Sequence, residues 1–85
     1  MKLYFENSYG ERKPIADVKT RSDVFRAIHA YINKCNEGKP EDKKFKSYYI
    51  RYWDNGDGYI KYDVGSWSEF FFLKISESEK IEFFR

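Results

Sequence analysis

The residues best suited to binding chemistry lie between positions 49 and 63, where aromatic and charged side chains alternate with apolar ones. The alternating set is Tyr49, Arg51, Trp53, Tyr59, Lys61 and Asp63. Aromatic rings beside cations can stack on nucleic-acid bases and hold phosphates. Tyr, Trp and Arg are also the residue types that dominate hot spots in protein–protein interfaces. Trp67, in the bend that follows, completes this candidate binding face.

A purely structural interpretation competes with binding for the same residues. Side chains on neighbouring strands stabilise one another as cross-strand pairs. We favour this structural interpretation for Arg51 and Asp63, which have opposite charges. For Tyr49, Trp53 and Tyr59, the sequence supports binding and structural roles about equally.

The sequence offers no constellation for catalysis or metal binding. His29 is the only histidine and Cys35 the only cysteine, so no second ligand stands at the spacing of a zinc site. The two residues lie about 600° of helical rotation apart and point in different directions, which argues against a nucleophilic pair. Asp63 and Glu69 could form an acid pair, but Arg51 is the better partner for Asp63. We therefore expect no enzyme, no catalytic residue, no metal and no cofactor.

The segment Asp54-Asn55-Gly56-Asp57-Gly58 resembles part of a calcium-binding loop. Aligning Gly58 with the invariant glycine of an EF-hand places Trp53 at the first ligand position and Val64 at the last. Both positions require oxygen ligands. The segment is therefore interpreted as a β-turn.

That turn predicts the register of a central hairpin formed by strands at 46–54 and 59–64. Gly58 in the left-handed region would form a G1 bulge. The resulting cross-strand pairs are Tyr52–Tyr62, Ile50–Val64, Arg51–Asp63 and Trp53–Lys61. A two-residue turn at Asn55 and Gly56 would place Arg51 against Ile60 and mix charge into the core, so that register is rejected.

The other elements follow from hydrophobic periodicity and capping residues. Residues 2–7 and 12–18 form a first hairpin, with Pro14 restricting the second strand to an edge. A helix begins at Thr20 or Ser22 and ends before Gly38. Its apolar positions recur at helical spacing: Val24, Ile28, Tyr31, Ile32 and Cys35.

Three features describe the chain after the central hairpin. Ser66 and Glu69 match a capping box, which allows one helical turn in the bend. Residues 70–75 form a further strand. Residues 81–84 fit a short edge strand or a helical tail equally well.

Together these elements predict one α+β domain over residues 1–85. Its element order is ββαβββ, with one helix packed on one face of an antiparallel sheet. An exposed, aromatic-rich edge strand leaves a homodimer open.

Composition and charge bear on where the protein is located in the cell and on which class of partner it binds. The net charge of +2 is too small to indicate nucleic acid by itself. Residues 12–51 hold eleven basic and five acidic side chains, whereas residues 52–85 hold four basic and seven acidic ones. We favour a solvated surface over a binding face as the reason for this asymmetry. With no membrane span, no signal peptide in MKLYFENS and a single cysteine, we expect a cytoplasmic protein.

The chain resembles a group of small uncharacterised proteins from phages and prophages of Gram-positive bacteria. The resemblance is carried by FENSYGERKPI near the N-terminus and by FKSYYIRYW and DVGSWSEFF farther along. In those segments the matching residues are Phe45, Lys46, Ser47, Tyr48, Tyr49, Arg51, Trp53, Asp63, Val64, Gly65, Ser66, Glu69, Phe70 and Phe71. Trp67 replaces a polar residue of the group, and the chain after Ile75 is longer. The resemblance implies an origin in a mobile element and brings no activity or mapped site.

These observations lead to two functional hypotheses. The first is a non-enzymatic phage or prophage accessory protein that binds a host or phage protein, for example to inhibit a host defence or regulatory enzyme. The alternative is a small nucleic-acid-binding module that uses the aromatic and basic face of the hairpin with the lysine-rich residues 39–46. The second hypothesis predicts binding that weakens steeply with salt.

Overall fold

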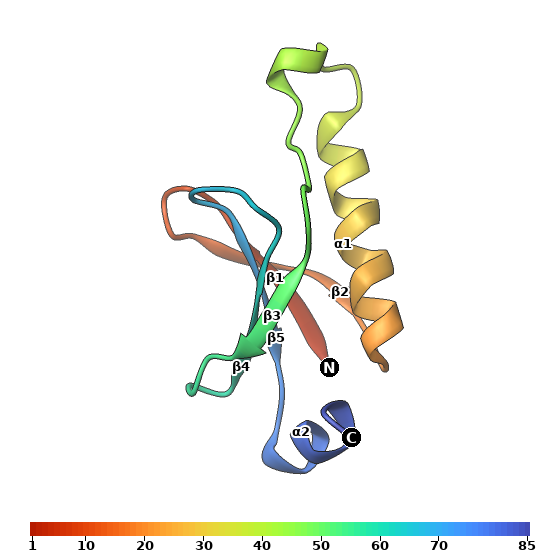
Figure 1. The fold of residues 1–85 in the computed structure, drawn as a ribbon, viewed down its shortest axis with the longest axis vertical. Helices are drawn as coiled ribbons and strands as arrows, with labels where there is room; N and C mark the ends of the chain where they lie inside the picture. The colour runs from red at the N-terminus through yellow and green to blue at the C-terminus, as the bar shows by residue number, and fades with distance from the viewer.

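The computed structural model describes residues 1–85 and contains five β-strands and two α-helices (Figure 1). The elements in chain order are β1 (Lys2–Glu6), β2 (Arg12–Asp17), α1 (Arg21–Asn36), a 3-10 helix (Glu41–Lys43), β3 (Arg51–Asp54), β4 (Tyr59–Asp63), β5 (Phe70–Lys74) and α2 (Glu77–Phe83). All neighbouring strands are antiparallel. The predicted α+β class and its antiparallel sheet are confirmed. Neither helix has the length and apolar character needed to cross a membrane.

The strand order in the sheet is β2-β1-β5-β4-β3. The hairpin of β1 and β2 therefore forms one half of the sheet, and the hairpin of β3 and β4 forms the other half. Strand β5 lies between the two hairpins. Leu3 of β1 and Ile60 of β4 both pair with Leu73 of β5. This central position explains why β5 is the most apolar strand, since both of its neighbours are strands and one face meets the helices.

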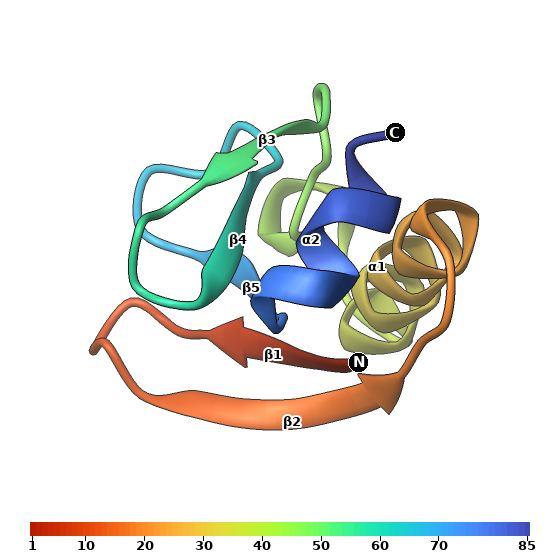
Figure 2. The same ribbon diagram turned by 90° about the horizontal axis from the view of Figure 1, so that it is seen from below.

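Both helices lie on the same side of the sheet, as the view in Figure 2 shows. The sheet contributes Leu3, Phe5, Ile60, Tyr62, Phe71 and Leu73 to the core, and the helices contribute Val24, Ile28, Ile32 and Phe83. Burying each large apolar side chain stabilises the fold by about 1.5–3 kcal/mol before conformational entropy is subtracted. The single predicted helix is therefore joined on its side of the sheet by a second, shorter one.

A capping box begins α1. The Thr20 hydroxyl accepts a hydrogen bond from the Asp23 amide at 3.2 Å, and the Asp23 carboxylate accepts from the Lys19 and Thr20 amides at 3.1 Å each. These backbone hydrogen bonds lower the pKa of Asp23 below its usual value. Of the two predicted caps, the structure uses Thr20. At the other end, Gly38 has a φ of 73°, which glycine tolerates.

The predicted register of the central hairpin is confirmed within the strands. Tyr52 pairs with Tyr62, Arg51 with Asp63 and Trp53 with Lys61, and Gly58 has a positive φ. Gly56 also has a positive φ, a feature that the predicted turn did not include.

The predicted start of β3 is wrong, because the strand begins at Arg51 instead of position 46. The Asn36 side chain at the end of α1 forms two 2.7 Å hydrogen bonds with the backbone of Phe45, which ties this stretch to the helix. The Tyr48 amide then donates to the Val64 carbonyl at 3.1 Å. Ile50 and Val64 consequently do not form the predicted strand pair.

The two uncertain segments of the second half have clear conformations. Ser66 and Glu69 form only half of the predicted capping box, because the Ser66 hydroxyl accepts from the Glu69 amide at 3.3 Å but donates to the Glu69 carboxylate at 2.8 Å. The bend does not become helical before β5 begins. The C-terminal tail is helical. Its cap, Ser76, accepts from the Glu79 amide, and Glu79 in turn accepts from the Ser76 amide.

Candidate functional site

The face of the sheet that points away from both helices contains most of the candidate binding residues. We call it the outer face and define it by alternate strand positions. Its members are Lys2, Tyr4, Glu6, Arg12, Arg51, Trp53, Tyr59, Lys61, Asp63, Phe70, Phe72 and Lys74. The structure thus brings five of the predicted residues onto one surface, because they alternate with the buried positions of β3 and β4.

Cations lie over aromatic rings at the centre of the outer face. The Arg12 guanidinium is 3.6 Å from the centre of the Phe72 ring and 5.1 Å from that of Tyr59. Lys61 Nζ is 4.1 Å from the centre of the Phe70 ring. In such cation–π contacts the positive charge is attracted to the face of the ring, and the side chain that carries the charge shields the ring from water. Phe72 is consequently only 2% exposed although no helix covers it.

This surface also includes four residues that the sequence did not predict as members of it, namely Tyr4, Arg12, Phe70 and Phe72. Their alternation with buried residues within each strand was visible in the sequence. The residues beside them on adjacent strands could not be identified from the sequence, because the order of strands in a sheet depends on contacts between distant segments. The Tyr59 ring packs edge-on against Tyr4 and Phe72, so this predicted residue belongs to the covered centre.

The ion pair between Arg51 and Asp63 forms as predicted, with 2.7 Å between Nη2 and Oδ2. Asp63 also accepts a 2.9 Å hydrogen bond from the Gly65 amide. Burial alone would raise the pKa of Asp63, but the Arg51 and Gly65 hydrogen bonds outweigh it and hold the pKa below its usual value. Asp63 thereby fixes one end of the Arg51 side chain, which remains largely exposed.

Three predicted residues remain accessible beside one another at the β3 edge. Tyr49 is 47% exposed and Trp53 is 40% exposed, while the side chain of Arg51 between them is 65% exposed. The Arg51 guanidinium lies 5.0 Å from the centre of the Tyr49 ring. We call Tyr49, Arg51 and Trp53 the β3 patch. Apart from Trp67, the candidate set therefore divides into this accessible patch and a less exposed group, in which Tyr59 and Lys61 are half-buried and Asp63 is buried.

Trp67 does not belong to the outer face. It lies in the bend between β4 and β5 and is 98% exposed. Trp67 therefore lies outside the strands that carry the predicted residues of the outer face.

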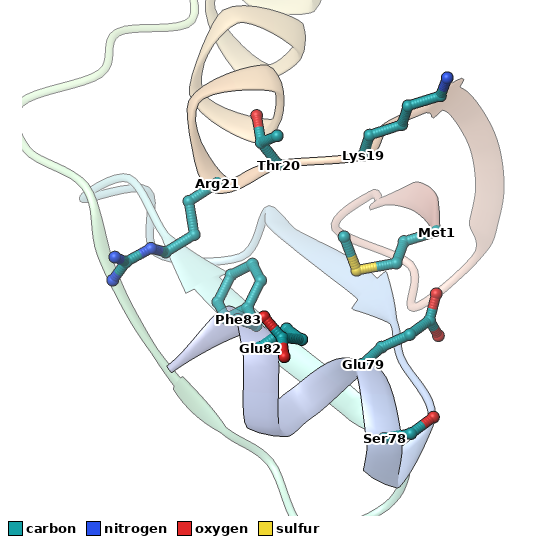
Figure 3. Close-up of a pocket in the computed structure, with 8 residues that line it drawn as sticks. All are labelled: Met1, Lys19, Thr20, Arg21, Ser78, Glu79, Glu82 and Phe83. Carbon is teal, nitrogen blue, oxygen red and sulfur yellow. The ribbon is translucent and has the colours of Figure 1, made fainter. Parts of the chain in front are cut away.

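The largest cavity, about 730 Å³, lies between the start of α1 and α2 (Figure 3). Its lining residues are Met1, Lys19, Thr20, Arg21, Ser78, Glu79, Glu82 and Phe83. None belongs to the candidate set. Thr20 and Glu79 are already engaged in capping the two helices, and Arg21 donates to the Tyr52 hydroxyl at 3.3 Å. These three polar residues of the cavity thus serve the fold.

His29 and Cys35 do not form a site. His29 is exposed on α1, and Cys35 is half-buried, whereas the sequence suggested a core position for the cysteine. No group of three or more His, Cys, Asp or Glu side chains is arranged to hold a metal ion.

No protein-family model, curated protein or solved structure matches this chain. Its function is accordingly inferred from its own side chains.

Proposed function

We propose that this chain is a non-enzymatic accessory protein, encoded by a phage or prophage, that acts in the cytoplasm by binding another protein through the β3 patch. Inhibition of a host factor is the role we favour. The observation that carries the proposal is the exposure of Tyr49, Arg51 and Trp53 as one group on an edge of the sheet.

The chemistry of the β3 patch suits a protein interface. Tyr, Trp and Arg are the residues most enriched among interface hot spots. The ion pair with Asp63 and the contact with Tyr49 restrict Arg51 before any partner arrives. A restricted side chain loses less conformational entropy on binding, which favours affinity.

The phage or prophage origin rests on the sequence resemblance. All three patch residues are among those that carry it, as is Asp63, which holds Arg51 in place. A cytoplasmic location is consistent with the single cysteine, which can form no disulfide within the chain.

Affinity capture from a host lysate tests the proposal when wild-type protein is compared with Trp53→Ala and Arg51→Ala. Truncating a hot-spot residue costs about 2 kcal/mol or more, which is roughly a 30-fold loss of affinity. The partner should therefore disappear from both variants. Tyr9→Ala is the control, because Tyr9 is 87% exposed in the turn between β1 and β2 and should leave capture unchanged.

Equal capture by wild-type protein and both patch variants would contradict the proposal. So would capture that Tyr9→Ala abolishes to the same extent. Sedimentation of the purified chain distinguishes a homodimer from a complex with a foreign partner, since a homodimer would form without lysate.

A further inference from the structure

A second cleft, about 610 Å³ in volume, lies where the connection from α1 to β3 passes the bend between β4 and β5. Its residues come from two segments. The connection contributes Lys39, Asp42, Lys43, Lys44, Phe45, Lys46 and Tyr48, and the bend contributes Gly65, Ser66, Trp67, Ser68 and Glu69. Neither the outer face nor the β3 patch contributes a residue. We call this the lysine cleft.

The basic wall of the lysine cleft is held in place by α1. Asn36 donates to the Phe45 carbonyl and accepts from the Phe45 amide, at 2.7 Å each. The 3-10 helix Glu41–Lys43 shapes the stretch just before this clamp. The lysines therefore extend from a fixed backbone.

Two of the four lysines are free to meet an anion. Lys44 and Lys46 share Glu41 as an ion-pair partner, at 3.4 Å and 3.6 Å. Lys39 and Lys43 have no carboxylate within ion-pair distance. Four lysines line the cleft against two carboxylates, those of Asp42 and Glu69. The cleft thus carries an excess of positive charge.

Two aromatic side chains line the cleft together with these lysines and are largely exposed to solvent. Trp67 is 98% exposed and Tyr48 is 72% exposed. The Tyr48 amide donates to the Val64 carbonyl, and Gly65 leaves room for the Tyr48 ring, since a Cβ there would lie 3.2 Å from Tyr48 Cδ2. The bend that carries Trp67 is tied by the contacts between Ser66 and Glu69.

We propose that the lysine cleft binds single-stranded nucleic acid, with Trp67 and Tyr48 stacking on bases and Lys39 and Lys43 neutralising phosphates. Proteins that bind single strands combine a positively charged groove with aromatic rings on which bases stack. A duplex presents no free base faces to such rings, and an acidic peptide carries no nucleobases to stack on them. This activity is independent of the β3 patch and of the proposed protein partner.

Intrinsic fluorescence can locate the contact, because the chain has only two tryptophans. The probe is a 12-nucleotide oligothymidylate added at low salt. In Trp53→Phe, Trp67 is the sole tryptophan, and its emission should be quenched on binding. In Trp67→Phe, the remaining Trp53 lies on the outer face, and its emission should stay nearly constant.

The aromatic and basic contributions can be separated with variants that preserve the fold. Trp67→Ala should weaken binding roughly 5- to 150-fold, the range for loss of one base-stacking ring. Because Trp67 is almost fully exposed, its removal should leave urea unfolding unchanged.

Charge variants then test the lysines. Lys43→Ala should weaken binding several-fold and reduce the magnitude of the salt slope by about 0.7, the value for one phosphate contact on a single strand. Lys74→Ala removes the same charge from the outer face and should change neither quantity.

Four results would overturn the proposal. They are the absence of binding at low salt, quenching of Trp53 equal to that of Trp67, equal losses in Lys43→Ala and Lys74→Ala, and equal affinity for a duplex or for polyglutamate. The last result would identify a general polyanion surface or an acidic protein partner. Equal lysate capture by wild-type protein and the β3 patch variants would contradict the proposed function but leave this proposal intact, so the two proposals fail separately.

Discussion

Gly65 is the one glycine that is required both by its backbone conformation and by the packing around it. Its φ is 92°, and an added Cβ would lie 3.2 Å from Tyr48 Cδ2. Its amide also donates to Asp63, which holds Arg51. Gly65 therefore helps to position both Arg51 of the β3 patch and Tyr48 of the lysine cleft.

Gly65→Ala should lower the free energy of unfolding by more than Gly10→Ala does. Both positions have a positive φ, which costs a non-glycine residue about 1–2 kcal/mol. Only Gly65 adds a close approach to a neighbouring side chain, since nothing lies within 4 Å of a Cβ at Gly10. Urea unfolding measures both variants, and equal losses would show that the approach to Tyr48 costs nothing.

Tyr62 should tolerate the loss of its hydroxyl. The side chain is fully buried between β3 and the helices, and its hydroxyl has no hydrogen-bond partner. Burial, the largest cause, raises the pKa of Tyr62 well above its usual value, as expected for a hydroxyl without a partner. An unpaired buried polar group costs about 1–3 kcal/mol. Tyr62→Phe should therefore leave stability unchanged or increase it, and a shift of the urea midpoint to lower concentration would contradict this expectation.

Among the elements, α2 depends most on its cap, because it has only seven residues and buries only Phe83. Ser76→Ala removes the side-chain acceptor for the Glu79 amide and should destabilise the helix by about 1 kcal/mol. Faster amide exchange in residues 77–83 would report the loss. Ser68→Ala, in the exposed bend, is the control and should leave that exchange unchanged.

Sequence patterns predicted the elements whose signals are local. α1 has a capping box and a buried stripe at Val24, Ile28 and Ile32, and the turn at 55–58 determined the hairpin register. The tail also has a capping box, at Ser76 and Glu79, but its few apolar residues fit a strand as well as a helix. The lysine cleft could not be predicted, because it requires Lys43 and Trp67, which are 24 positions apart in the sequence, to line the same surface.

At the scale of the whole molecule, stability should fall in acid. Five carboxyl groups have pKa values lowered by hydrogen bonds or cations, namely those of Asp23, Glu41, Asp54, Asp63 and Glu79. A carboxyl with a lower pKa in the folded state stabilises the fold above its unfolded pKa. This contribution is lost as the pH falls below the ordinary values of 3.8 for Asp and 4.5 for Glu and through the lower folded-state values.

Urea midpoints at pH 7, pH 4 and pH 3 measure this effect. The midpoint should be highest at pH 7 and fall in both acid steps. Asp63→Asn should show a smaller fall than wild-type protein, because it removes one of the linked groups. A midpoint that does not change between pH 7 and pH 3 would contradict the linkage.

The central position of β5 has a consequence for the time course of folding. The two hairpins can each form from residues close in sequence, but neither contacts the other in the sheet until β5 pairs with both. The pairing of Leu3 with Leu73 closes a loop of about 70 residues, and long loops are entropically costly to close. Joining the hairpins should therefore limit the folding rate. A nascent chain would expose two half-sheets until its last strand is synthesised.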